Sequence, residues 1–199
     1  MTRRVPALLL GCALTAAGVR ADTDVHGAGA PPPLPGASLY QLNLDLEPAA
    51  GKSLPLASFR GRPLVVTMFY STCTTMCPIL TLAMSWTAAA LSREERAKAG
   101  FLLVSFDAER DTPAKLAEFQ ASHHLDASTF VVAHARATDV RALAAALGIR
   151  YRQLPDGSFS HASIITLLDR AGVPVARTQV LAAEDEGFVA SLRAALAAP

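Results

Sequence analysis

Two cysteines four residues apart are the part of this sequence best suited to chemistry. Cys73 and Cys77 lie in the segment Cys-Thr-Thr-Met-Cys-Pro, and residues at i and i+4 of a helical turn point to one side. The two sulfurs can then close a disulfide or hold one soft metal ion, because thiolates select copper(I), zinc or iron–sulfur units. Two thiolates are fewer than the four ligands that a zinc site normally has, whereas copper(I) accepts two or three soft ligands. The pair therefore favours copper(I) with one further ligand.

His161 is the candidate for that further ligand. It lies in a Gly- and Ser-rich loop directly before a strongly apolar run, so the end of a flexible loop can bring its ring over the edge of a sheet. That the ring reaches the sulfurs is an expectation. The alternatives stay open at this point: a CxxxC pair in an exported protein also forms structural disulfides, and a single histidine before a strand is usually an ordinary loop residue. Met76 offers a third sulfur, although a methionine in a turn more commonly packs.

The elements around the cysteines indicate how they are positioned. Residues 64–70 (LVVTMFY) form an apolar run typical of a buried strand, and residues 78–91 are expected to form a helix. The cysteines thus fall on a strand-to-helix turn. Unpaired backbone N–H groups and the positive end of the helix dipole favour a thiolate there and lower its pKa.

Helical and strand patterns alternate along the rest of the chain. Strands are expected over 101–106, 130–133 and 163–169, helices over 112–123, 138–147 and 184–197, and a returning hairpin strand over 173–180. This alternation predicts an α/β domain whose central sheet is covered by helices on both faces. By its own pattern, the charged segment 107–111 is an ordinary solvated loop.

Composition and charge exclude several classes of protein. The 199 residues are 51% hydrophobic and 18% charged, so the chain can bury a core and is not disordered throughout. Much of the apolar content is alanine rather than a span of about 20 bulky residues, which excludes a polytopic membrane protein. A net charge of +1 argues against a nucleic-acid partner. Three cysteines cannot build a disulfide-rich scaffold.

The N-terminal residues indicate export. A positively charged start precedes an apolar run over 5–19, and Val19-Arg20-Ala21 has small residues where a signal peptidase reads, so residues 1–21 are expected to be a signal peptide. Two alternatives stay open. A lipoprotein would keep a lipidated Cys12, and an uncleaved anchor would keep the apolar run in the membrane.

Export sets the expected organisation and location of the mature protein. Residues 22–38 are rich in proline and glycine and are expected to form an extended linker, followed by the folded domain over 39–199. We expect that domain in the periplasm or another extracytoplasmic compartment, with the N-terminus as its membrane contact where an anchor is retained. In an oxidising compartment two thiols form a disulfide unless a reductant or a metal holds them.

Three segments taken together resemble a known family. FYSTCTTMCP at 69–78, VSFDAERDTP at 104–113 and SHASIITLLD at 160–169 resemble the Sco/SenC family, whose members are exported, thioredoxin-like copper proteins associated with assembly of the binuclear copper centre of cytochrome c oxidase. The resemblance covers about residues 39–197. It implies a thioredoxin-like central mixed sheet flanked by helices.

The resemblance also implies roles for single residues. Cys73, Cys77 and His161 are implied as the copper ligands, with the two cysteines also acting as a redox dithiol and disulfide. Asp107 is implied as an acid near the site. The implied partners are a copper-accepting respiratory protein, such as an oxidase subunit, and a donor of copper or electrons.

Function then divides between two expectations. The first is a metallochaperone that delivers copper by ligand exchange, and the alternative is a thiol-disulfide oxidoreductase that reduces the cysteines of a copper-accepting partner. An ordinary thioredoxin-like oxidoreductase would show CxxC rather than CxxxC and would need no histidine. A peroxiredoxin would have threonine three residues before its reactive cysteine, where this chain has Tyr70.

Overall fold

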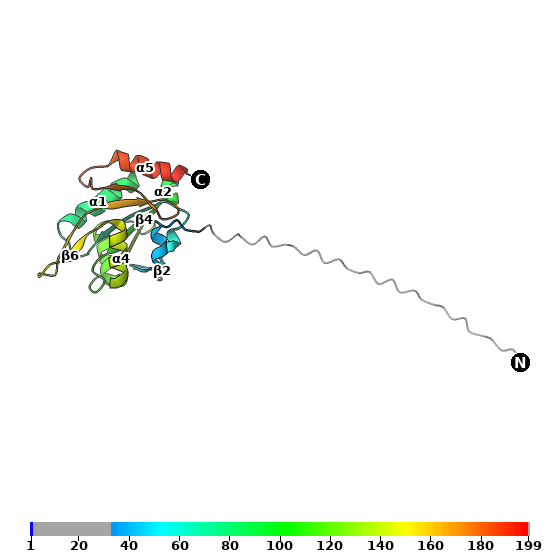
Figure 1. The fold of residues 1–199 in the computed structure, drawn as a ribbon, viewed down its shortest axis with the longest axis horizontal. Helices are drawn as coiled ribbons and strands as arrows, with labels where there is room; N and C mark the ends of the chain where they lie inside the picture. The colour runs from blue at the N-terminus through cyan, green and yellow to red at the C-terminus, as the bar shows by residue number, and fades with distance from the viewer. Residues whose placement is uncertain (2–32, 199) are drawn as a thin grey trace. The chain divides into compact units, whose positions relative to one another are not determined.

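The computed structural model describes Met1 and residues 33–198, and residues 33–198 contain a mixed β-sheet with helices packed on it (Figure 1). Two predicted segments lie largely outside the described residues. They are the signal peptide over 1–21, of which only Met1 is described, and the linker over 22–38, of which only residues 33–38 are described. In the part of the chain that is described, none of the helices combines the length and the hydropathy needed to cross a membrane.

The elements alternate much as the sequence predicts. The first half contains η1 (Leu39–Leu42), β1 (Asp45–Pro48), β2 (Leu54–Pro55), η2 (Leu56–Phe59), β3 (Leu64–Phe69), α1 (Met76–Ala89), α2 (Arg93–Lys98) and β4 (Gly100–Ser105). The second half contains α3 (Pro113–Ser122), β5 (Phe130–His134), α4 (Ala137–Leu147), β6 (Tyr151–Gln153), β7 (Phe159–His161), β8 (Ile165–Leu168), β9 (Pro174–Thr178) and α5 (Glu186–Ala197). Each predicted strand and helix is present, with ends that differ by a few residues.

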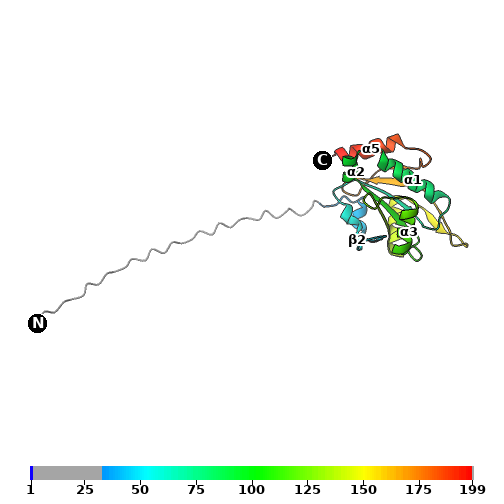
Figure 2. The ribbon, with the colours of Figure 1, turned by 180° about the vertical axis from the view of Figure 1, so that it is seen from behind.

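The sheet confirms the predicted thioredoxin-like architecture. Its seven strands run in the order β2-β1-β5-β4-β3-β8-β9, with β3, β4 and β5 parallel and the remaining pairs antiparallel. Helices cover both faces of the sheet: α4 lies in front of it in Figure 1, whereas α3 lies on the other side, in front in Figure 2, where Phe119 packs on Phe69 of β3. Every residue of β3 and β4 is buried, as expected for parallel strands covered on both faces.

Two predicted helix ends are confirmed in detail. Thr112 caps α3 by accepting a hydrogen bond from the Lys115 N–H, and Pro113 occupies the first turn. The α4 helix ends at Gly148, whose φ of 70° lies in the left-handed region that glycine adopts without strain.

The topology brings two distant segments to one edge of the sheet. Strand β8 runs antiparallel to β3, with Leu168 opposite Leu64 and Thr166 opposite Val66. The start of β8 therefore lies where β3 ends, and the Thr67 hydroxyl donates a 2.7 Å hydrogen bond to the Ile164 carbonyl there. The segment after β3 and the segment before β8 meet at this edge, beyond the carboxyl ends of the parallel strands, where α/β sheets commonly place their sites.

Candidate metal centre

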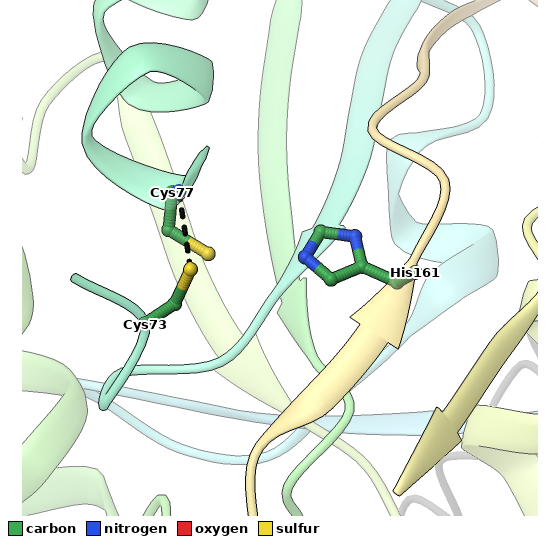
Figure 3. Close-up of side chains that lie close together, drawn as sticks. All are labelled: Cys73, Cys77 and His161. Carbon is green, nitrogen blue, oxygen red and sulfur yellow. Dashed lines mark hydrogen bonds between the residues drawn. The ribbon is translucent and has the colours of Figure 1, made fainter. Parts of the chain in front are cut away.

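Both cysteines belong to the turn that joins β3 to α1. The Cys73 N–H donates to the Tyr70 carbonyl at 3.2 Å, and the Cys77 N–H donates to the Cys73 sulfur at 3.3 Å (Figure 3). Helix α1 begins at Met76, two residues earlier than predicted, so Cys77 stands on its first turn. Both thiols are free, with Cys73 7% exposed and Cys77 fully buried. The start of the helix thus surrounds the Cys73 sulfur with N–H donors.

His161 is the last residue of β7 rather than part of a flexible loop. The β6–β7 hairpin, which the sequence analysis did not predict, pairs His161 with Tyr151 and fixes its backbone. The ring packs against Phe106, with centroids 4.9 Å apart, and more distantly against Tyr70 at 6.0 Å. Nδ1 lies 3.3 Å from the Ala162 carbonyl, and when it donates there Nε2 is left with its lone pair.

The structure brings Cys73, Cys77 and His161 into one cluster. One ligand atom from each residue lies within 4.8 Å of the others, and the imidazole faces the two sulfurs (Figure 3). Two atoms that bind one ion at about 2.0–2.3 Å lie about 3.3–4.6 Å apart, depending on the angle at the ion, so the cluster is slightly wider than or close to the size that a single ion requires. Two sulfurs and one nitrogen suit copper(I).

The pKa values of the two thiols are shifted in opposite directions. Burial is the strongest influence on Cys73 and raises its pKa, but hydrogen bonds from the Cys77 thiol and from the N–H groups at the start of α1 outweigh it, so the pKa of Cys73 is lowered. Burial raises the pKa of Cys77, and the neighbouring Cys73 sulfur and Asp111 carboxylate add to this effect. The predicted helix-terminus effect therefore holds for Cys73, whereas burial overrides it at Cys77.

Burial also sets the protonation of the third residue. It lowers the pKa of His161, against a smaller opposing effect of the Ala162 carbonyl. The imidazole is therefore neutral at neutral pH and able to act as a ligand.

Asp111 is a residue of this site that the sequence analysis missed. Its fully buried carboxylate accepts a 2.9 Å hydrogen bond from the Ser71 N–H and further hydrogen bonds from the Ser71 and Ser105 hydroxyls. It thereby ties the loop that leads to Cys73 to the end of β4. The interpretation of 107–111 as a solvated loop is wrong for its two aspartates.

Two other residues singled out from the sequence have different surroundings. Asp107 is also buried, but it forms a 2.5 Å ion pair with Arg110 and lies outside the Cys–Cys–His cluster. Burial is the main reason that the pKa of Asp107 is raised, although the Arg110 guanidinium opposes it. Met76 is 42% exposed, so it is not the packing residue that its position in a turn suggested.

Removing the Asp111 carboxylate is expected to destabilise the domain. Asp111→Ala leaves the half-buried Ser71 N–H and two hydroxyls without their acceptor, which should lower the free energy of unfolding by about 2–4 kcal/mol. Asp111→Asn keeps one acceptor oxygen and should lose less. Urea unfolding of both variants checks this expectation. Wild-type stability in the alanine variant would show that the carboxylate does not hold the loop.

A family model described as SCO1/SenC matches residues 36–197. None of the curated proteins compared with the sequence matches it.

Several solved structures share the fold. The copper-bound ScoI of Bradyrhizobium japonicum is 22% identical, with a TM-score of 0.66 over 76% of this chain and 96% of that one. A SCO1/SenC family lipoprotein of Bacillus anthracis str. Ames is 18% identical, with a TM-score of 0.67 over 75% and 90%. BsSco, described as having a disulfide switch and as a member of the Sco family of cytochrome c oxidase assembly proteins, is 19% identical, with a TM-score of 0.67 over 78% and 92%. At these identities the likeness establishes the fold.

Proposed function

The chain belongs to the SCO1/SenC family, and on that premise we propose that it is an exported copper metallochaperone that holds copper(I) through Cys73, Cys77 and His161. The observation that carries this proposal is the cluster of two sulfurs and one imidazole nitrogen within 4.8 Å at one edge of the sheet. A structural disulfide would need no histidine beside it, and a structural zinc site would normally have a fourth ligand.

Two of the similar structures support copper as the cargo and an oxidase as the acceptor. The B. japonicum protein binds copper, and BsSco belongs to a family of cytochrome c oxidase assembly proteins. We propose that this chain likewise passes copper to a respiratory copper site such as that of cytochrome c oxidase, after receiving copper or electrons from a donor.

We also propose the organisation expected from the sequence. It comprises a signal peptide or anchor over 1–21, a linker over 22–38 and the copper-binding domain over 39–199 in the periplasm or a similar compartment. That the B. anthracis relative is a lipoprotein supports attachment to a membrane through the N-terminus.

Ligand exchange is the mechanism that the residues support. The lowered pKa of Cys73 supplies a thiolate to the incoming ion, while Cys77 must release a proton as it binds. His161 completes the site as a neutral donor. An acceptor's thiolates can then replace these ligands one at a time, so that copper moves without any change in its oxidation state and without a covalent bond forming in a substrate.

One observation favours a second candidate function, a thiol-disulfide oxidoreductase. The two thiols divide the roles of that reaction: Cys73 has the lowered pKa of an attacking thiolate, and Cys77 beside it has a raised pKa and remains a thiol. Attack by Cys73 on a partner disulfide would form a mixed disulfide and release one partner thiolate. Attack by Cys77 would then release the second, leaving the partner reduced and this pair oxidised.

Copper(I) titration of the reduced domain tests the proposed function. The competitor is a chromophoric copper(I) chelator, and we expect about one equivalent of tightly bound copper, consistent with the single cluster. Reduction of a disulfide substrate by the same preparation measures the second candidate. Tight copper binding with negligible reductase activity supports the metallochaperone, and the reverse result supports the oxidoreductase.

His161→Ala is expected to weaken copper binding without abolishing it. The two sulfurs remain and copper(I) tolerates two ligands, so we expect a loss of affinity of about 10- to 100-fold, or about 1.4–2.7 kcal/mol. Formation of the Cys73–Cys77 disulfide should be retained. His123→Ala, at the end of α3 and outside the cluster, is the matched control and should bind copper like the wild type. Loss of disulfide formation in His161→Ala would instead make the histidine a structural residue.

A further inference from the structure

Helix α1 carries an exposed apolar stripe that begins at the proposed copper site. Within residues 33–198, five large apolar side chains are exposed by more than a third, and three of these lie within one short stretch of α1. They are Met76, Ile79 and Leu82, which are 42%, 40% and 46% exposed. Their spacing of three residues places them on one face of the helix, and this set is called the α1 stripe below.

The α1 stripe lies in a segment without charge. No Asp, Glu, Lys or Arg occurs between Arg62 and Arg93. A helix that lies on a membrane surface normally bears Lys and Arg on its polar face, whereas the opposite face of α1 is buried in the core through Cys77, Leu80 and Met84. An uncharged apolar surface of this kind instead fits an uncharged apolar patch on another protein.

The position of the α1 stripe indicates which protein would cover it. Met76 is adjacent to Cys77, and Cys77 stands on the first turn of the same helix (Figure 3). A partner that covers the stripe therefore lies beside the two sulfurs and the imidazole. Any ligand at the edge of its contacting surface would be brought to the place where copper is exchanged.

From this arrangement, and resting on the proposed function, we infer that the α1 stripe is the docking surface for the copper-accepting protein. The partner's chemistry follows from the surface: an uncharged apolar patch with thiolate, thioether or imidazole ligands at its border. Docking by apolar contact orients the ligands of the two proteins, and copper then passes between them by ligand exchange.

The test compares copper transfer to a protein with copper transfer to a small chelator. The acceptor is the isolated copper-binding domain of a cytochrome c oxidase subunit from the same organism, reduced and free of metal. Ile79→Glu and Leu82→Glu place a charge on the stripe with a residue that favours helix. Val175→Glu is the matched control. Val175 is 54% exposed on the edge strand β9 and therefore resembles the stripe residues in exposure. Its neighbour Pro174 pairs with Leu168, which pairs with Leu64 at the start of β3, so Val175 lies near the end of the sheet away from the cysteines.

We expect both stripe variants to transfer copper to the acceptor domain at least about tenfold more slowly than the wild type, since a charge buried in an apolar interface weakens it strongly. Transfer to the chelator needs no docking and should be unchanged in every variant. Val175→Glu should match the wild type in both assays. Circular dichroism of each variant checks that α1 is intact.

Several outcomes would overturn the inference. Wild-type transfer rates in both stripe variants would do so, as would equal slowing of transfer to the chelator, which would place the effect in the copper site itself. If acceptor transfer is unchanged but the stripe variants lose self-association in sedimentation, the stripe binds a second copy of this chain. If they instead lose binding to phosphatidylglycerol vesicles, the stripe binds a membrane. A wild-type protein that loads the chelator but not the acceptor would refute this partner, while one that binds no copper would refute the proposed function.

Discussion

Replacing either cysteine by serine is expected to abolish tight copper(I) binding by the reduced domain. Cys73→Ser and Cys77→Ser each exchange a soft thiolate for a hard hydroxyl that remains protonated at neutral pH, leaving one sulfur and one imidazole. We expect the affinity to fall by more than about 1000-fold, which corresponds to about 4 kcal/mol. Serine differs from cysteine by one atom, so the effect of the change on packing is small. Competition with a chromophoric copper(I) chelator measures the loss.

Met76→Leu is the matched control for the two serine variants. It removes the third sulfur of the turn, at a side chain that is 42% exposed, and keeps an apolar residue of similar volume. Affinity like that of the wild type would show that the Met76 sulfur is not a ligand. If either serine variant instead retained wild-type affinity, the proposed ligand set would be wrong.

The buried elements of the fold were predictable because their patterns are long. Strands β3 and β4 are buried on both faces and appear in the sequence as mostly apolar runs, each with a single hydroxyl residue. The short strands β1 and β2 leave no such signal, because only part of each is buried. The α2 helix has no buried residue to mark it, although its capping box, Ser92 with Glu95, is a recognisable start signal.

The three residues of the candidate cluster could be singled out from the sequence, but the elements that position them could not. Cysteine spacing and a strand-to-helix turn indicate a thiolate site, whereas the approach of His161 depends on β8 running antiparallel to β3, which no local pattern specifies. The hairpin that holds His161 turns at Pro155-Asp156-Gly157, a typical turn sequence that could have revealed it. The role of Asp111 could not be found this way, because burial of a charged residue is a property of tertiary structure.

Oxidation of the cysteine pair is expected to eliminate copper binding completely and reversibly. Disulfide formation removes one electron from each thiolate and leaves two neutral sulfurs that are poor ligands for copper(I), so the metal and the disulfide exclude each other. The sulfurs already lie within 4.8 Å of one another, so the pair can close by small side-chain movements. We expect the oxidised domain to bind no copper in the chelator assay, and full binding to return after reduction. Copper loading should in turn protect both thiols from oxidation.

The reduction potential of the pair distinguishes a working dithiol from a structural disulfide. The N–H groups at the start of α1 stabilise the Cys73 thiolate, and stabilising the reduced form makes a disulfide easier to reduce. We therefore expect a potential above about −300 mV, the level below which structural disulfides typically lie. Equilibration with glutathione or dithiothreitol buffers measures it, with thiol alkylation reporting the reduced fraction. A potential well below that level, or copper bound by the oxidised protein, would mean that the pair stabilises the fold and does not exchange copper.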